Sequence, residues 1–106
     1  MKQGTVYQYR YNPSVIKNLL DACTRVFAVS SHDIKEGGRY GHLPSIRGLC
    51  CAYLKEFGLT YDNIGLALHM TRYNAMHHFK KHEGRMEFDP DYAVSWDALK
   101  EELNKG

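Results

Sequence analysis

The chain has 106 residues, of which 43% are hydrophobic and 25% charged, as expected for one globular domain. It has no internal repeat, low-complexity tract, membrane-length apolar run or export signal, so we expect a cytoplasmic protein without a membrane role. The chain has three cysteines, Cys23, Cys50 and Cys51, and no C-x-x-C spacing, which argues against a disulfide framework or a zinc finger. We expect these cysteines to be small buried residues.

Charge is unevenly distributed along the chain. The formal net charge is +2, but residues 1–86 carry twelve Lys or Arg against six Asp or Glu, and residues 87–106 carry two against six. A basic body with an acidic end favours a polyanion partner on one face.

The N-terminal segment is predicted to be an arm, residues 1–12. Residues 5–11 alternate like a strand, but no second strand candidate follows, so we expect an extended arm. Its tyrosines either pack on the body, pair with a second copy or, as the least favoured alternative, stack on bases. Asn12 and Pro13 predict the start of a helix that runs to about Val29. Ser30 or Ser31 caps a short turn after it.

Residues 36–44 form a loop with three glycines and a proline, and it carries Arg39, Tyr40 and His42. Two readings stay open: a solvated connector, or a basic loop that follows phosphates or puts Arg39 into a minor groove. A helix is then predicted from Ser45 to Gly58, with Arg47 near its start.

Residues 59–82 predict two short helices with a tight break. Thr60 and Thr71 are suitable caps. The second helix has an apolar face, Ala75, Met76 and Phe79, and an outer face mostly of hydrogen-bond donors: Arg72, Tyr73, Asn74, His77, His78, Lys80 and Lys81. This pattern is typical of a helix-turn-helix, here at residues 60–83.

A connector at residues 85–89 and a last helix starting at Asp89–Pro90, with an acidic outer face, complete the chain. We therefore predict an all-α fold of about five helices, with residues 13–106 as a single DNA-binding domain.

The order of these elements resembles the C-terminal, Trp-repressor-like DNA-binding domain of the bacterial replication initiator DnaA. The resemblance covers residues 13–84. The family's Asp-Leu turn is matched by Asp33-Ile34, its basic loop by residues 35–44, and its Met-Tyr-Leu helix end by Ala52-Tyr53-Leu54. Its Ile-Gly element is matched by Ile64-Gly65, and its Asp-His-Thr-Thr-Val-x-His signature stands where this chain has residues 72–78.

The departures from the family limit what the resemblance implies. The signature's reading residues are replaced by Arg72-Tyr73-Asn74-Ala75, so the family's target sequence is not carried over. His78 keeps the last histidine, which resembles a phosphate contact, and Arg39 is the counterpart of the minor-groove arginine. No ATPase motif is present, so the chain resembles a free-standing module of the kind that phage or mobile elements carry.

The predicted function is binding of double-stranded DNA in replication or transcription regulation. Arg72, Tyr73 and Asn74 are expected to face bases, and a second group to contact phosphates: Arg39, Arg47, His78, Lys80 and Lys81. Tyr40, His42, Thr71 and His77 complete the candidate interface.

Other functions are less well supported by the residues. His78 and His82 have zinc-pair spacing, but H-E-x-x-H is absent, so we expect no metal, cofactor, small-molecule substrate or enzymatic activity. The alternative is an interaction module that binds a host protein without reading DNA. A homodimer or a protein partner is expected to use the N-terminal arm or the last helix.

Overall fold

A computed structural model describes residues 13–37 and 41–105, and these form six α-helices and no β-strand. They are α2 (Pro13–Phe27), α3 (Ser31–Glu36), α4 (Leu43–Glu56), α5 (Tyr61–Leu68), α6 (Arg72–Phe88) and α7 (Pro90–Lys105). The all-α prediction is confirmed, with six helices instead of about five because the turn predicted after Ser30 is the helix α3. The predicted arm at 1–12, Arg39 and Tyr40 lie outside the described residues.

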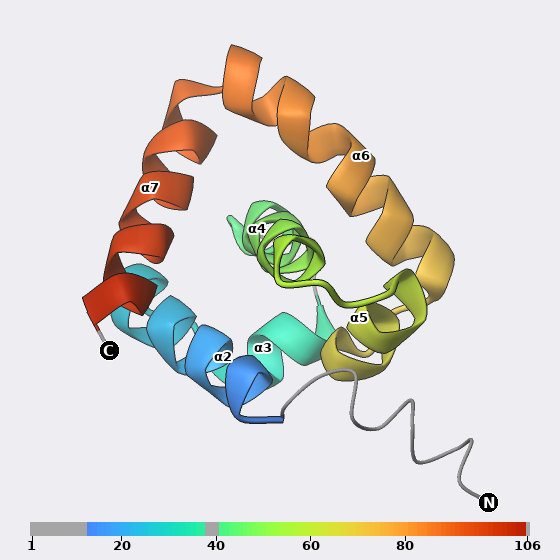
Figure 1. Cartoon of the computed structure of the whole chain (residues 1–106). Helices are drawn as coiled ribbons and strands as arrows, with labels where there is room; N and C mark the ends of the chain where they lie inside the picture. The colour runs from blue at the N-terminus through green and yellow to red at the C-terminus, as the bar shows by residue number, and fades with distance from the viewer. Residues whose placement is uncertain (1–12, 38–40, 106) are drawn as a thin grey trace, which may run out of the picture.

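The fold is organised around α4, which the other helices surround (Figure 1). Its buried residues lie on nearly all sides: Leu43, Ile46, Gly48, Leu49, Cys50, Cys51, Ala52 and Leu54. A helix that is apolar on most of its circumference is stable only in an interior, which explains its central position. α7 packs against α2 and α6 and closes the ring around it.

Local capping explains most helix ends. The side-chain oxygens of Thr60 and Thr71 accept hydrogen bonds from the amides three residues later, both at 3.1 Å, so both predicted caps are confirmed. α2 ends at Phe27, earlier than predicted, because Ala28 takes the left-handed conformation with φ 59°. α4 begins at Leu43, with the following proline in its first turn, and not at Ser45.

The predicted connector at residues 85–89 is wrong, because α6 continues to Phe88. Arg85 and Met86 follow the helical period of the inward face and turn toward the body, which keeps the helix intact. The helix stops only where Asp89 precedes Pro90, since a residue before proline is disfavoured in the helical region. α6 is therefore one turn longer than the sequence predicts.

All three cysteines are buried and free, as predicted. The Sγ atoms of Cys23 and Cys50 lie 3.6 Å apart across α2 and α4, and burial raises the pKa of the Cys51 thiol to about 12. They act as small core residues between helices. None of the helices in the described ranges has the length and apolar character that crossing a membrane requires.

Candidate nucleic-acid interface

The turn between α5 and α6 brings the two helices into close contact. His69 ends α5 in the left-handed conformation with φ 56°, and the Met70 amide donates to the Gly65 carbonyl at 2.9 Å. A Cβ on Gly65 would lie 2.5 Å from the Met70 carbonyl oxygen, so a larger residue requires the turn to move. The turn therefore fixes where α6 starts.

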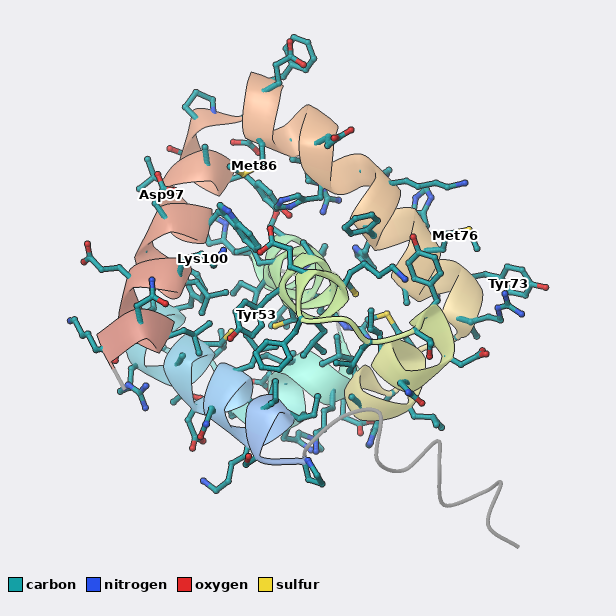
Figure 2. The ribbon with its side chains drawn as sticks, in the orientation of Figure 1. Tyr53, Tyr73, Met76, Met86, Asp97 and Lys100 are labelled. Carbon is teal, nitrogen blue, oxygen red and sulfur yellow. The ribbon has the colours of Figure 1, made fainter. Side chains whose placement is uncertain are left out.

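The outer face of the first three turns of α6 is accessible. Its exposed residues are Arg72, Tyr73, Asn74, His77, Lys80 and Lys81. Tyr73 is 70% exposed and projects away from the body (Figure 2). Residues 72–81 include no Asp or Glu, so this face combines cations with amide, imidazole and hydroxyl groups, which suits contact with a polyanion.

The inward face of α6 differs from the prediction at one position. Ala75 is fully buried, and the Phe79 ring packs with its centroid 6.2 Å from that of Tyr61. Met76 is half-buried but does not pack against the core, and its side chain points outward (Figure 2). The prediction that Met76 anchors the helix is wrong, because the inward face repeats from Ala75 to Phe79 and then to Met86, leaving Met76 about 100° away.

Arg72 stands between two neighbours at the start of α6. Its Nε lies 3.7 Å from the Oδ1 of Asp62 on α5, and its guanidinium carbon lies 5.6 Å from the Tyr73 ring centroid. All three side chains are more than half exposed, so these contacts hold Arg72 only weakly. A DNA base would have to compete with Asp62 for the guanidinium.

Arg47 does not lie on this outer face. Its Nη2 donates to the carbonyl of Leu68, the last residue of α5, at 3.1 Å, and its Nε is buried. Its Nη1 fills the space where a Cβ on Gly37 would lie, at 2.7 Å. Arg47 therefore caps the C-terminal end of α5 and joins it to the end of α3, a structural role instead of the predicted phosphate contact.

His78 also turns away from the outer face. It is half-buried, with its Nδ1 buried against α4, and the ideal Cβ position of Gly48 is 3.5 Å from that atom. Burial, followed by the nearby charges of Arg85 and Arg47, lowers the pKa of His78 to about 4. His78 is therefore neutral near pH 7 and poorly placed for the phosphate contact that the family resemblance implies.

The histidine pair at zinc-ligand spacing faces the interior. His82 Nδ1 lies 2.7 Å from the Tyr92 hydroxyl, and its ring packs on the Trp96 ring with centroids 4.6 Å apart. Burial also lowers the pKa of His82. Within the described residues no three His, Cys, Asp or Glu side chains meet as a metal site would require.

The predicted basic loop begins beside the turn that precedes α6. Glu36 Oε2 at the end of α3 lies 3.7 Å from His69 Nδ1, and Gly37 follows against Arg47. His42 is exposed where the loop meets α4. The entry to the loop is thus next to the candidate interface, whereas Arg39 and Tyr40 themselves fall in the undescribed segment.

The acidic helix α7 leaves the start of α6 uncovered. Its ring and hydrogen-bond contacts to α6 fall on His82 and Arg85, in the second half of α6. Its carboxylate Glu102 pairs with Arg25 of α2 at 2.6 Å. The two helices meet at the C-terminal end of α6 and diverge from there (Figure 1), so α7 does not cover the donors of the first three turns of α6.

Comparisons of the chain with protein-family models, curated proteins and solved structures gave no significant match. The interface therefore rests on residues and geometry alone. The sequence patterns predict no role for Asp62, which resembles an ordinary acidic residue in a first helical turn, and they include Gly65 only as part of the family resemblance. A glycine inside an apolar helix was the available signal for the close approach of the turn.

Proposed function

We propose that this protein binds duplex DNA through a helix-turn-helix in which α6 enters the major groove and α5 supports it. The observation that carries the proposal is the exposed donor face of residues 72–81, which has no carboxylate of its own and which α7 does not cover. The close contact of Gly65 with the Met70 carbonyl supports it further, because a fixed turn presents the start of α6 as a rigid unit.

The exposed residues divide by chemistry. Arg72 and Asn74, in the first turn, have the planar donor groups that pair with guanine and adenine edges, and Tyr73 beside them suits a thymine methyl or a phosphate. His77, Lys80 and Lys81 suit phosphates. The loop residues Arg39, Tyr40 and His42 remain candidates for an adjacent groove. Arg47 and His78 are left out of this interface because their side chains serve the interior.

Among helix-turn-helix modules, the order of elements favours a DnaA-like, Trp-repressor-like one, which it resembles. The resemblance in element order and the loop entry beside the turn support an origin-binding or transcription-regulating role in a phage, a mobile element or its bacterial host. Because residues 72–75 differ from the family's signature, the target sequence is this protein's own.

The salt dependence of binding tests the proposal. Fluorescence anisotropy with a labelled random duplex, repeated from 50 to 300 mM salt as an illustrative range, gives the slope of log affinity against log salt concentration. Each phosphate contact contributes about −0.9 to that slope, so three contacts give about −2.7. Absent binding at the lowest salt, or a slope near zero, contradicts the proposal.

Two substitutions separate base contacts from phosphate contacts. Asn74→Ala should cost about 1–3 kcal/mol on a selected target and little on random DNA. Lys81→Ala should weaken binding to all sequences and make the slope less negative by about 0.9. Lys105→Ala, on the acidic helix α7, is the matched control and should change neither. Equal effects of Asn74→Ala and Lys81→Ala on both DNAs contradict this division.

An interaction module that does not read DNA is the second candidate, and one observation favours it. Phe88 and Val94, near the junction of α6 and α7, are 77% and 67% exposed, far more than core side chains. Exposed apolar side chains of this size often belong to protein interfaces. If the folded protein does not bind DNA even at the lowest salt, this candidate is favoured.

A further inference from the structure

A pocket opens at the end of the molecule where α2 ends and where α4 and α7 begin. Its volume is about 600 Å³, and its apolar lining comes from Phe27, Val29, Leu43, Ile46, Leu49 and Val94. That volume is within the range of sites that hold a ligand or several side chains. Val94 is 67% exposed, so apolar surface continues from the pocket to the outside.

Negative charge lies at this pocket. Asp89 and Asp91 both line it, and neither has an ion-pair partner within 4 Å among the residues that the structure describes. One Asp89 oxygen accepts a hydrogen bond from the Tyr92 amide, and Asp91 is exposed. The lining also includes the polar residues His42, Ser45, Tyr92 and Ser95. The complementary occupant is an apolar or aromatic segment with a positive charge.

The chain contains a segment of that chemistry. Residues 1–12 hold Tyr7, Tyr9 and Tyr11 at alternating positions, together with Lys2 and Arg10, and no Asp or Glu. In an extended segment alternate side chains share a side, which would place the tyrosines together and Arg10 opposite them. Aromatic rings for the pocket and a cation for its carboxylates are therefore present in one short stretch.

The extended length of this segment limits which copy of the pocket it can enter. Residues 1–12 join the body at Pro13, and α2 separates that point from Phe27 at the pocket by about 21 Å, at 1.5 Å per residue. At about 3.3 Å per residue, Tyr11 extends about 7 Å from Pro13 and Tyr9 about 13 Å. The backbone at Tyr9 and Tyr11 therefore stops short of the pocket of its own molecule.

We propose that the N-terminal segment of one copy enters the α2–α4–α7 pocket of a second copy, with Tyr9 and Tyr11 in the apolar interior and Arg10 against Asp91. Two copies that exchange their segments reciprocally form a closed, symmetric dimer, because each presents the same pocket and the same segment. This inference does not rest on DNA binding. If the protein both forms this dimer and binds DNA through α6, the dimer presents two α6 helices, as symmetric operators require.

Sedimentation equilibrium of the full chain without DNA tests the dimer, and a charge exchange tests the pairing. Arg10→Glu and Asp91→Lys should each weaken dimerisation about tenfold or more, since each places like charges at both pockets. The double variant with both changes should restore it. Asp97→Lys, an exposed residue of α7 that points away from the body in Figure 2, makes the same charge change and should leave the dimer intact.

Contacts from the tyrosines to the pocket complete the test. In a mixed sample of labelled and unlabelled chains, the rings of Tyr9 and Tyr11 should give intermolecular nuclear Overhauser effects to Val94 and Leu43. A chain that is monomeric at millimolar concentration overturns the inference, as does a dimer unaffected by either single charge reversal. A double variant that stays monomeric overturns the Arg10–Asp91 pairing. None of these outcomes depends on whether DNA binds.

Discussion

Replacing three helical glycines with alanine in turn tests how the start of α6 is fixed. At Gly65 the added Cβ would lie 2.5 Å from a backbone oxygen, that of Met70, which can move only with the turn. At Gly48 it would meet a terminal nitrogen of Arg85, also at 2.5 Å, at the end of a flexible side chain. At Gly84, on the exposed side of α6, nothing lies within 4 Å.

The expected free energies of unfolding follow from these contacts. Alanine in place of glycine inside a helix stabilises by about 0.5–1 kcal/mol where space allows, which is the expectation for Gly84→Ala. Overpacking costs about 1–3 kcal/mol, so Gly65→Ala should be destabilising by about 1–2 kcal/mol net. Gly48→Ala should fall between the two, because the Arg85 side chain can rotate away.

Thermal unfolding followed by circular dichroism measures the series. For a domain of this size about 1 kcal/mol corresponds to roughly 4–8 °C, so the extremes should differ by about 10 °C. Gly65→Ala should also weaken DNA binding below its unfolding temperature, whereas Gly84→Ala should not. If Gly65→Ala is as stable as Gly84→Ala, the Met70 carbonyl does not constrain this position and the account of the turn is refuted.

Three further predictions address single side chains. Arg47→Met removes a charged hydrogen bond to the Leu68 carbonyl and should destabilise by about 1–3 kcal/mol in urea unfolding, while the salt slope of DNA binding stays unchanged; a reduced slope would contradict the capping role. The pKa of His78 is about 4 in the folded chain against 6.5 when unfolded, so stability is complete above pH 6.5 and declines as pH falls to 4. The variant His78→Gln should have a melting temperature that depends less on pH over this interval. A pH dependence as steep as that of the unchanged protein would contradict the lowered pKa of His78. Asp62→Asn frees the Arg72 guanidinium and removes a negative charge, so affinity for duplex DNA should rise about two- to fivefold; unchanged or weaker binding would show that Asp62 does not compete.

Local sequence features predicted several helices without any tertiary information. Thr60 and Thr71 each supply the side-chain acceptor that a helix start needs, and both caps are present. The apolar residues of α2 recur with the helical period, and the same pattern places Leu19 and Leu20 on its buried face. Asp89 and Pro90 predicted the start of α7, because Asp89 supplies a side-chain acceptor and proline suits the first position of a helix.

The orientation of α6 was decided only by the packed structure. This helix carries polar residues on both sides, so its periodicity does not distinguish the side facing α4 and α7 from the side facing solvent. Packing selects His78 and His82 for the interior and leaves Met76 outside, against their hydropathy. In the same way, the sequence predicts that Arg47 is a surface cation. Only the tertiary structure shows that it donates to the carbonyl of Leu68, twenty-one residues away. Sequence therefore determined where α2, α5, α6 and α7 start and which faces are strongly apolar, whereas long-range contacts determined which polar side chains remain available to a partner.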